Sequence, residues 1–193
     1  MTNEQPTDNA MIADFSYDKT TVNKKLMKEF VYKHLHNVQR DAFDSIYNAE
    51  DPEFTYILLK AAIQLAQSEG SKTLMSKHTK MAVDGYNQLA DDLNSSPPAR
   101  VTKKWMREHA RSRVDSKKVS QKAIDIIHNK VDDGLITMAK WNMTLLVSSA
   151  QKTVMEKHAT TALDVYDTLK VVLNIVNDDN EAAEQTDMQT DPE

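Results

Sequence analysis

A basic segment in the middle of the chain has the residue types and spacing to bind an anion. Residues 100–122 hold nine lysines or arginines against two carboxylates, a net charge of +7 over 23 residues. Such cations neutralise phosphates and give affinity for a polyanion without reading its sequence. The alternative is an ordinary solvated helix face, with Trp105 anchoring a core rather than stacking on a base. The cations are Arg100, Lys103, Lys104, Arg107, Arg111, Arg113, Lys117, Lys118 and Lys122.

No pattern for catalysis accompanies these cations. The chain has no cysteine, no glycine-rich phosphate loop, no serine elbow and no recognisable pair of inward carboxylates. His78 and His158 occupy equivalent places, but no cysteine or carboxylate cluster accompanies them, so a structural role is favoured over a metal site. We therefore expect no enzymatic activity, no cofactor, no metal and no small-molecule substrate.

The chain also repeats itself at a separation of eighty residues. SKTLMSKH at 71–78 returns as QKTVMEKH at 151–158, and the identities continue downstream. Upstream, Ile46 matches Ile126 in the same ungapped register. An ungapped repeat indicates that one structural unit was duplicated, so that each half is a natural partner for the other.

Helices must position these residues, because the composition favours helix along most of the chain, with 3 Gly and 5 Pro. No apolar run is long enough to cross a membrane. We expect Asp51 to cap a helix restarting at Pro52, Gly70 to end that helix, and Ser120 to begin another. The expected helices are 21–33, 39–69 with a break at Asp51-Pro52, 74–93, 101–112, 120–150 and 154–176.

Charge is segregated along this organisation. Residues 177–193 carry −7 and the remainder +2, out of a net −5. Such an acidic segment is typical of a disordered, solubilising tail. The predicted divisions are a flexible arm over 1–19, a first unit over 20–94, a linker over 95–100, a second unit over 101–176 and the acidic tail over 177–193.

The second repeat resembles archaeal histones over residues 99–170, and residues 21–92 resemble them more loosely. The resemblance rests on Lys118-Val119-Ser120 before the long helix and Gln151-Lys152-Thr153-Val154 after it. It implies an all-α protein in which two histone folds, each of short, long and short helices, form an intramolecular handshake pseudo-dimer. A long helix of roughly 45 Å fits this, since a second copy crossing its midpoint would cover it.

In that family the loops at the ends of the long helices pair and touch DNA phosphates. The resemblance therefore implies DNA contacts at Lys72, Thr73, Lys152 and Thr153 in the second loops, and at Lys118, which matches an arginine that reaches the minor groove. The first repeat departs from the pattern at Val38-Gln39 and at Pro52, so its DNA surface is expected to be reduced.

The expected function is histone-like binding and compaction of double-stranded DNA without sequence specificity. The protein would be intracellular and associated with DNA in a nucleoid, chromatin or a viral particle. Further candidate partners are a second copy and other histone-fold proteins; a membrane is not expected. One alternative is a protein-interaction scaffold or transcription-complex subunit with little or no DNA binding. Another is a helical bundle that imitates the pattern, which long helices that fail to cross near their midpoints would favour.

Overall fold

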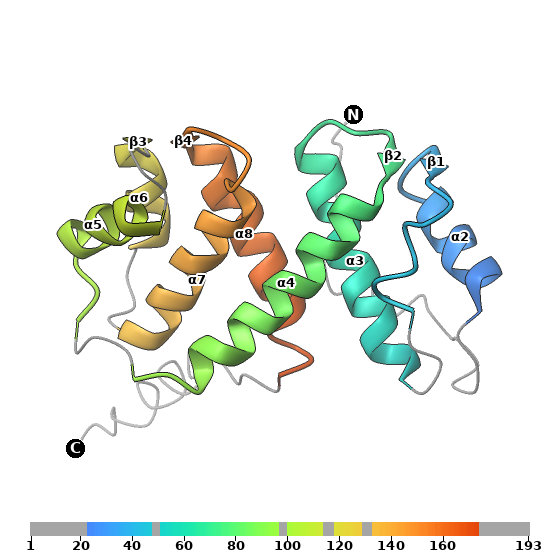
Figure 1. The fold of residues 1–193 in the computed structure, drawn as a ribbon, viewed down its shortest axis with the longest axis horizontal. Coiled ribbons are helices and arrows are strands. Elements are labelled where there is room, and N and C mark those ends of the chain that lie inside the picture. The colour runs from blue at the N-terminus through green and yellow to red at the C-terminus, as the bar shows by residue number, and fades with distance from the viewer. Residues whose placement is uncertain (1–22, 48–50, 97–99, 114–117, 129–132, 174–193) are drawn as a thin grey trace, which may run out of the picture.

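The computed structural model describes residues 23–47, 51–96, 100–113, 118–128 and 133–173, which are mostly helical (Figure 1). The expected arm over 1–19 and tail over 177–193 lie outside these residues. The prediction of an all-α protein is confirmed, with seven helices and four two-residue strands in the described part. The elements are α2 Lys24–Tyr32, β1 Asn37–Val38, α3 Pro52–Ser68, β2 Thr73–Leu74, α4 Ser76–Leu93, α5 Lys103–Arg113, β3 Lys118–Val119, α6 Gln121–Ile127, α7 Gly134–Val147, β4 Thr153–Val154 and α8 Glu156–Leu169.

Local sequence signals set several helix ends as expected. The Asp51 carboxylate accepts a hydrogen bond from the Phe54 N–H (2.9 Å), and Pro52 opens α3, where a missing N–H is harmless. Gly70 follows α3 with a φ of 71°, a conformation that glycine adopts without steric cost. Ser120 occupies the N-cap of α6 but makes no side-chain capping bond.

The two expected long helices are not continuous, which corrects the prediction. Turns occupy residues 40–46 after β1, and α6 ends at Ile127 before α7 begins at Gly134. The Asp133 carboxylate accepts hydrogen bonds from the N–H groups of Leu135 and Ile136 (2.8 and 3.2 Å), so it starts a new helix inside the span expected to be unbroken. The two halves of each repeat are therefore free to turn back on one another.

The strands pair within each repeat, not between repeats as the intramolecular handshake requires. In the first repeat Asn37 is paired with Thr73, and in the second Lys118 with Thr153; both pairings are parallel. A helix–strand–helix half thus packs against the other half of its own repeat. The expected crossing of two long helices at their midpoints is absent from the described residues, because neither helix runs through.

The repeat register also differs from the ungapped one. Buried Met27 and Val31 of α2 match buried Met106 and Ala110 of α5, a separation of 79 residues. After the first strand the separation is 81, because three buried positions in the first repeat have buried counterparts there. Ile46 therefore matches Ile127, not Ile126. The three pairs are Ala42 and Ala123, Phe43 and Ile124, and Ile46 and Ile127.

The repeats join through their second halves. Helix α3 packs against α8, and α4 against α7, so that four helices from both repeats lie together (Figure 1). A single apolar core includes Leu59 and Leu89 of the first repeat and Met143 and Leu169 of the second. A second core, containing Met106 and Trp141, lies within the second repeat. Residues of both repeats thus share one core.

A buried polar chain crosses the same junction. Asp92 at the end of α4 is 5% exposed, and its Oδ1 accepts hydrogen bonds from Gln88 Nε2 and Asn142 Nδ2, both 2.9 Å. The Asn142 Oδ1 lies 2.8 Å from His109 Nε2 on α5. The buried Asp92 Oδ2 has no hydrogen-bond partner among the described residues. Burial raises the pKa of the Asp92 carboxyl, although the bonds from Asn142 and Gln88 act to lower it.

Helix α4 approaches the second repeat closely at Gly85. A Cβ there would lie 3.2 Å from the Met143 Cε and Sδ and 3.4 Å from the Leu169 Cδ1. Gly85→Val is therefore expected to lower the free energy of unfolding by about 1–3 kcal/mol through overpacking, measured by urea denaturation. Asn87→Val, at an exposed position of the same helix, is the control and should change it by less than about 0.5 kcal/mol. Equal stability of the two variants would contradict this contact.

The buried carboxyl predicts a gain in stability from Asp92→Asn. Because its folded pKa is raised, the contribution of Asp92 to stability is complete below pH 3.8 and is lost as the pH rises through the raised pKa. At pH 7 the charged form opposes folding, so the amide should raise the free energy of unfolding by about 1 kcal/mol, less near pH 4. Urea unfolding at both pH values tests this, with exposed Asp91→Asn as control. A loss of stability at pH 7 would contradict it.

Candidate nucleic-acid interface

The second repeat brings three predicted contact residues together. The Lys118 N–H donates to the Lys152 carbonyl (3.2 Å), and Lys118 pairs with Thr153 across the two strands. The side chains of Lys118 and Lys152 are exposed, with no ion-pair partner among the described residues, whereas Thr153 is half-buried. Two lysines from opposite ends of the repeat therefore stand at one paired loop.

The first repeat forms the same kind of paired loop with one lysine. The Lys72 carbonyl accepts hydrogen bonds from the N–H groups of His36 and Asn37 (2.9 and 3.0 Å). Lys72 is exposed and Thr73 half-buried, while Asn37 stands where the second repeat has Lys118. The paired loop of the first repeat is thus less basic than that of the second.

Both paired loops lie along the same edge of the molecule, the upper edge in Figure 1, where all four strands are found. The packing of α3 with α8 and of α4 with α7 produces this arrangement, because β2 leads into α4 and β4 leads into α8. Lys72, Lys118 and Lys152 therefore belong to one edge. An extended polyanion lying along this edge could meet both loops.

The basic segment around α5 is partly neutralised by other side chains. The Lys103 Nζ lies 2.6 Å from Asp125 Oδ1, and the Lys104 Nζ lies 3.8 Å from Glu108 Oε1. Arg107 donates to Gln121, and Arg113 donates to Gln88 Oε1 across the repeat junction (3.2 Å). Lys122 lies 3.6 Å from Glu156. Arg100 and Arg111 are exposed, and Lys117 lies outside the described residues.

Trp105 packs against the core of the second repeat, as predicted. Its ring is half-buried and stacks on the His109 ring, with centroids 4.5 Å apart and planes 12° apart. Burial lowers the pKa of His109, although the hydrogen bond with Asn142 acts to raise it. With one face covered by His109, Trp105 has a structural role here.

His78 and His158 each cap a helix. The Nδ1 of His78 accepts a hydrogen bond from the Met75 N–H, and that of His158 from the Met155 N–H, both 3.1 Å. This closes the N-terminus of α4 and of α8, in the way that a glutamate or glutamine at the same position does in a capping box. No group of three potential metal ligands occurs among the described residues. The structural role favoured from the sequence is the one observed.

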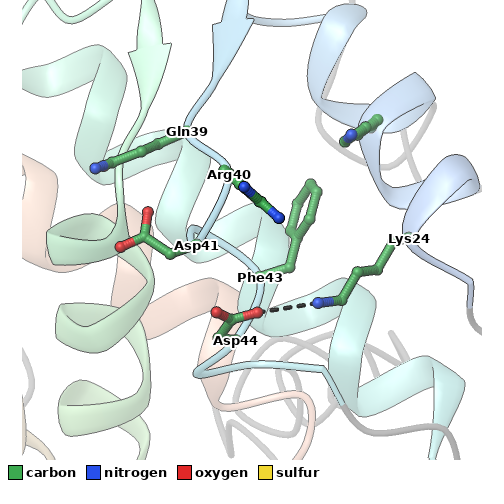
Figure 2. Close-up of a pocket in the computed structure, with 7 residues that line it drawn as sticks. Lys24, Gln39, Arg40, Asp41, Phe43 and Asp44 are labelled. Atoms are coloured by element: carbon green, nitrogen blue, oxygen red, sulfur yellow. Dashed lines mark hydrogen bonds and ion pairs between the residues drawn. The ribbon is translucent and has the colours of Figure 1, made fainter.

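One basic site went unrecognised in the sequence. A surface pocket of about 610 Å³ lies between α2 and the turns after β1 (Figure 2). Its cations are Lys24, Lys28 and Arg40, so the first repeat has a basic feature of its own. The separations of 79 and 81 residues would have matched these positions to Lys103, Arg107 and Gln121, but the ungapped register conceals that match.

Comparison of the chain with family models, curated proteins and solved structures finds no match. Within the described residues, no helix is both long and apolar enough to span a bilayer.

The buried cap at His78 predicts a stability that depends on pH. Burial lowers the pKa of His78, against the raising effect of Glu69, whose Oε2 lies 3.1 Å from its Nε2. The folded state therefore favours the neutral ring, so its contribution is present above pH 6.5 and is lost as the pH falls through the lowered pKa. His34 and His109 act in the same direction.

His78→Gln should keep the capping acceptor and remove this titration. The free energy of unfolding, measured with urea between pH 7.5 and 5, should then fall less steeply with acidification than in the unmodified protein. His36→Gln, at an exposed position, is the matched control and should leave the slope unchanged. An unchanged slope in His78→Gln would show that this ring is not a source of the pH dependence.

Proposed function

We propose that the protein binds double-stranded DNA without sequence specificity through its two paired loops. The observation that carries the proposal is the placement of three exposed lysines, Lys72, Lys118 and Lys152, on one edge without carboxylate partners among the described residues. Free ammonium groups gain most from a phosphate, because they give up no existing ion pair. Contacts of this kind fix a protein on the DNA backbone and carry no base information.

We further infer that each repeat is a histone-like unit closed on itself. Support comes from the order of helix, strand and helix in each half, and from the pairing of the first loop with the second. The arrangement brings together the same loops as a handshake does, but from within one repeat. The broken central helices also suit the rival view, a bundle that imitates the histone pattern.

A protein-interaction scaffold is the second candidate, and the side-chain pairs favour it. Lys103, Lys104 and Lys122 each lie near a carboxylate. Together with the net charge of −5, these pairs reduce the attraction of the basic segment for DNA. A scaffold would depend on the shared core and its exposed helices, and would tolerate neutral residues at the paired loops.

Salt dependence of binding separates the two candidates. Lys118→Gln/Lys152→Gln should weaken binding to a duplex by about tenfold or more and lower the slope of log K against log salt by about two, because two phosphate contacts are lost. Fluorescence anisotropy with a labelled duplex measures both. The control Lys25→Gln/Lys170→Gln has the same net charge, with Lys25 on α2 and Lys170 after α8, and should bind like the unmodified protein.

A chain that fails to bind duplex DNA at low salt, even without residues 177–193, would rule out the DNA proposal and leave the scaffold. Equal loss of affinity in both double variants would mean that net charge, not the paired loops, determines binding.

A further inference from the structure

The pocket beside α2 collects cations from two separate elements. Lys24 and Lys28 come from α2, and Arg40 from the turns that follow β1. The Lys24 Nζ reaches Asp44 Oδ1 at 3.0 Å, which ties α2 to those turns (Figure 2). Arg40 and Lys28 make no ion pair or hydrogen bond with the described residues. Two cations without partners therefore line one pocket.

The second repeat has the same framework with its polar groups satisfied. The ion pair of Lys103 with Asp125 is equivalent to that of Lys24 with Asp44 and confirms the separations of 79 and 81 residues. There Gln121 stands in place of Arg40, and it accepts a hydrogen bond from Arg107 while donating to Asp125 (2.7 Å). In the first repeat, Arg40 and Lys28 cannot satisfy one another, because both are positive.

The carboxylates of the pocket leave this positive charge in place. Asp44 is engaged by Lys24. Asp41 also lines the rim, but Figure 2 shows its carboxylate on the opposite side of the chain from Arg40, whose side chain points toward α2. The wall beneath is Phe43, which is 1% exposed and part of the shared core, so the turns have a fixed support. An anion between Arg40 and Lys28 would relieve their repulsion.

We propose that this pocket binds a phosphate group, held by the Arg40 guanidinium and the ammonium groups of Lys28 and Lys24. A guanidinium offers two parallel N–H donors to the oxygens of one phosphate, and lysines add compact positive charge from the other side. The phosphate is either a free phosphate or the backbone of a nucleic acid. The site is separate from the paired loops and does not depend on the DNA-binding proposal.

Titration of the full chain with inorganic phosphate tests the site. Amide chemical shifts of residues 24–28 and 39–44, followed by NMR at constant ionic strength with chloride as the replaced anion, should change and saturate. Arg40→Gln, which installs the residue of the second repeat, should weaken this binding by about tenfold or more, as should Lys28→Gln. Lys25→Gln, one position from Lys24 and outside the pocket lining, should leave it unchanged.

Shifts that rise linearly without saturating, or that persist equally in Arg40→Gln, would overturn the proposal. Because Arg40 is exposed, its replacement should preserve the fold, and a thermal melt checks this. Two further results identify the source of the phosphate. If Arg40→Gln also lowers the affinity for a duplex, the site takes a nucleic-acid backbone; if duplex affinity is unchanged, it takes a free phosphate. Both results differ from loss of binding in Lys118→Gln/Lys152→Gln, which concerns the paired loops.

Discussion

The structure depends on the packing of α3 and α4 against α7 and α8. This contact places apolar side chains from both repeats in one core, and Gly85 lets α4 approach Met143 and Leu169 closely. Small repeats bury too little apolar surface to be stable alone, so sharing a core is a physical requirement. The same packing turns both paired loops toward one edge, and therefore decides which lysines can act together.

Two kinds of polar contact distinguish the repeats within this shared frame. The chain of Asp92, Asn142 and His109 joins the first repeat to the second beneath the surface, with a carboxylate oxygen left unpaired. On the surface, the second repeat satisfies many of its cations internally, whereas the first leaves Lys28 and Arg40 open. The more basic sequence is thus not the one with more free charge, because neighbouring carboxylates and amides decide how much charge an anion can meet.

Much of the local structure could be predicted, since local residues cause it. The restart at Asp51-Pro52, the end of α3 at Gly70 and the structural role of the two histidines follow from groups a few residues away. The second long helix was wrong for an instructive reason. Its apolar periodicity continues across the break, but the Asp133 cap starts a new helix, and periodicity cannot detect the chain turning back. The one-residue changes of register were likewise hidden, because Ile126 and Ile127 are both apolar.

By itself the sequence determined the helical class, the duplication and the positions of the lysine-containing loops, because composition, spacing and capping act over short distances. Only the tertiary structure decided which loops pair and which charges remain free. Pairing within a repeat and pairing between repeats use the same strands and the same apolar faces, so the sequence pattern suits both. The choice between them rests on where the helices break and on how closely α4 meets α7, and these are properties of the packed chain.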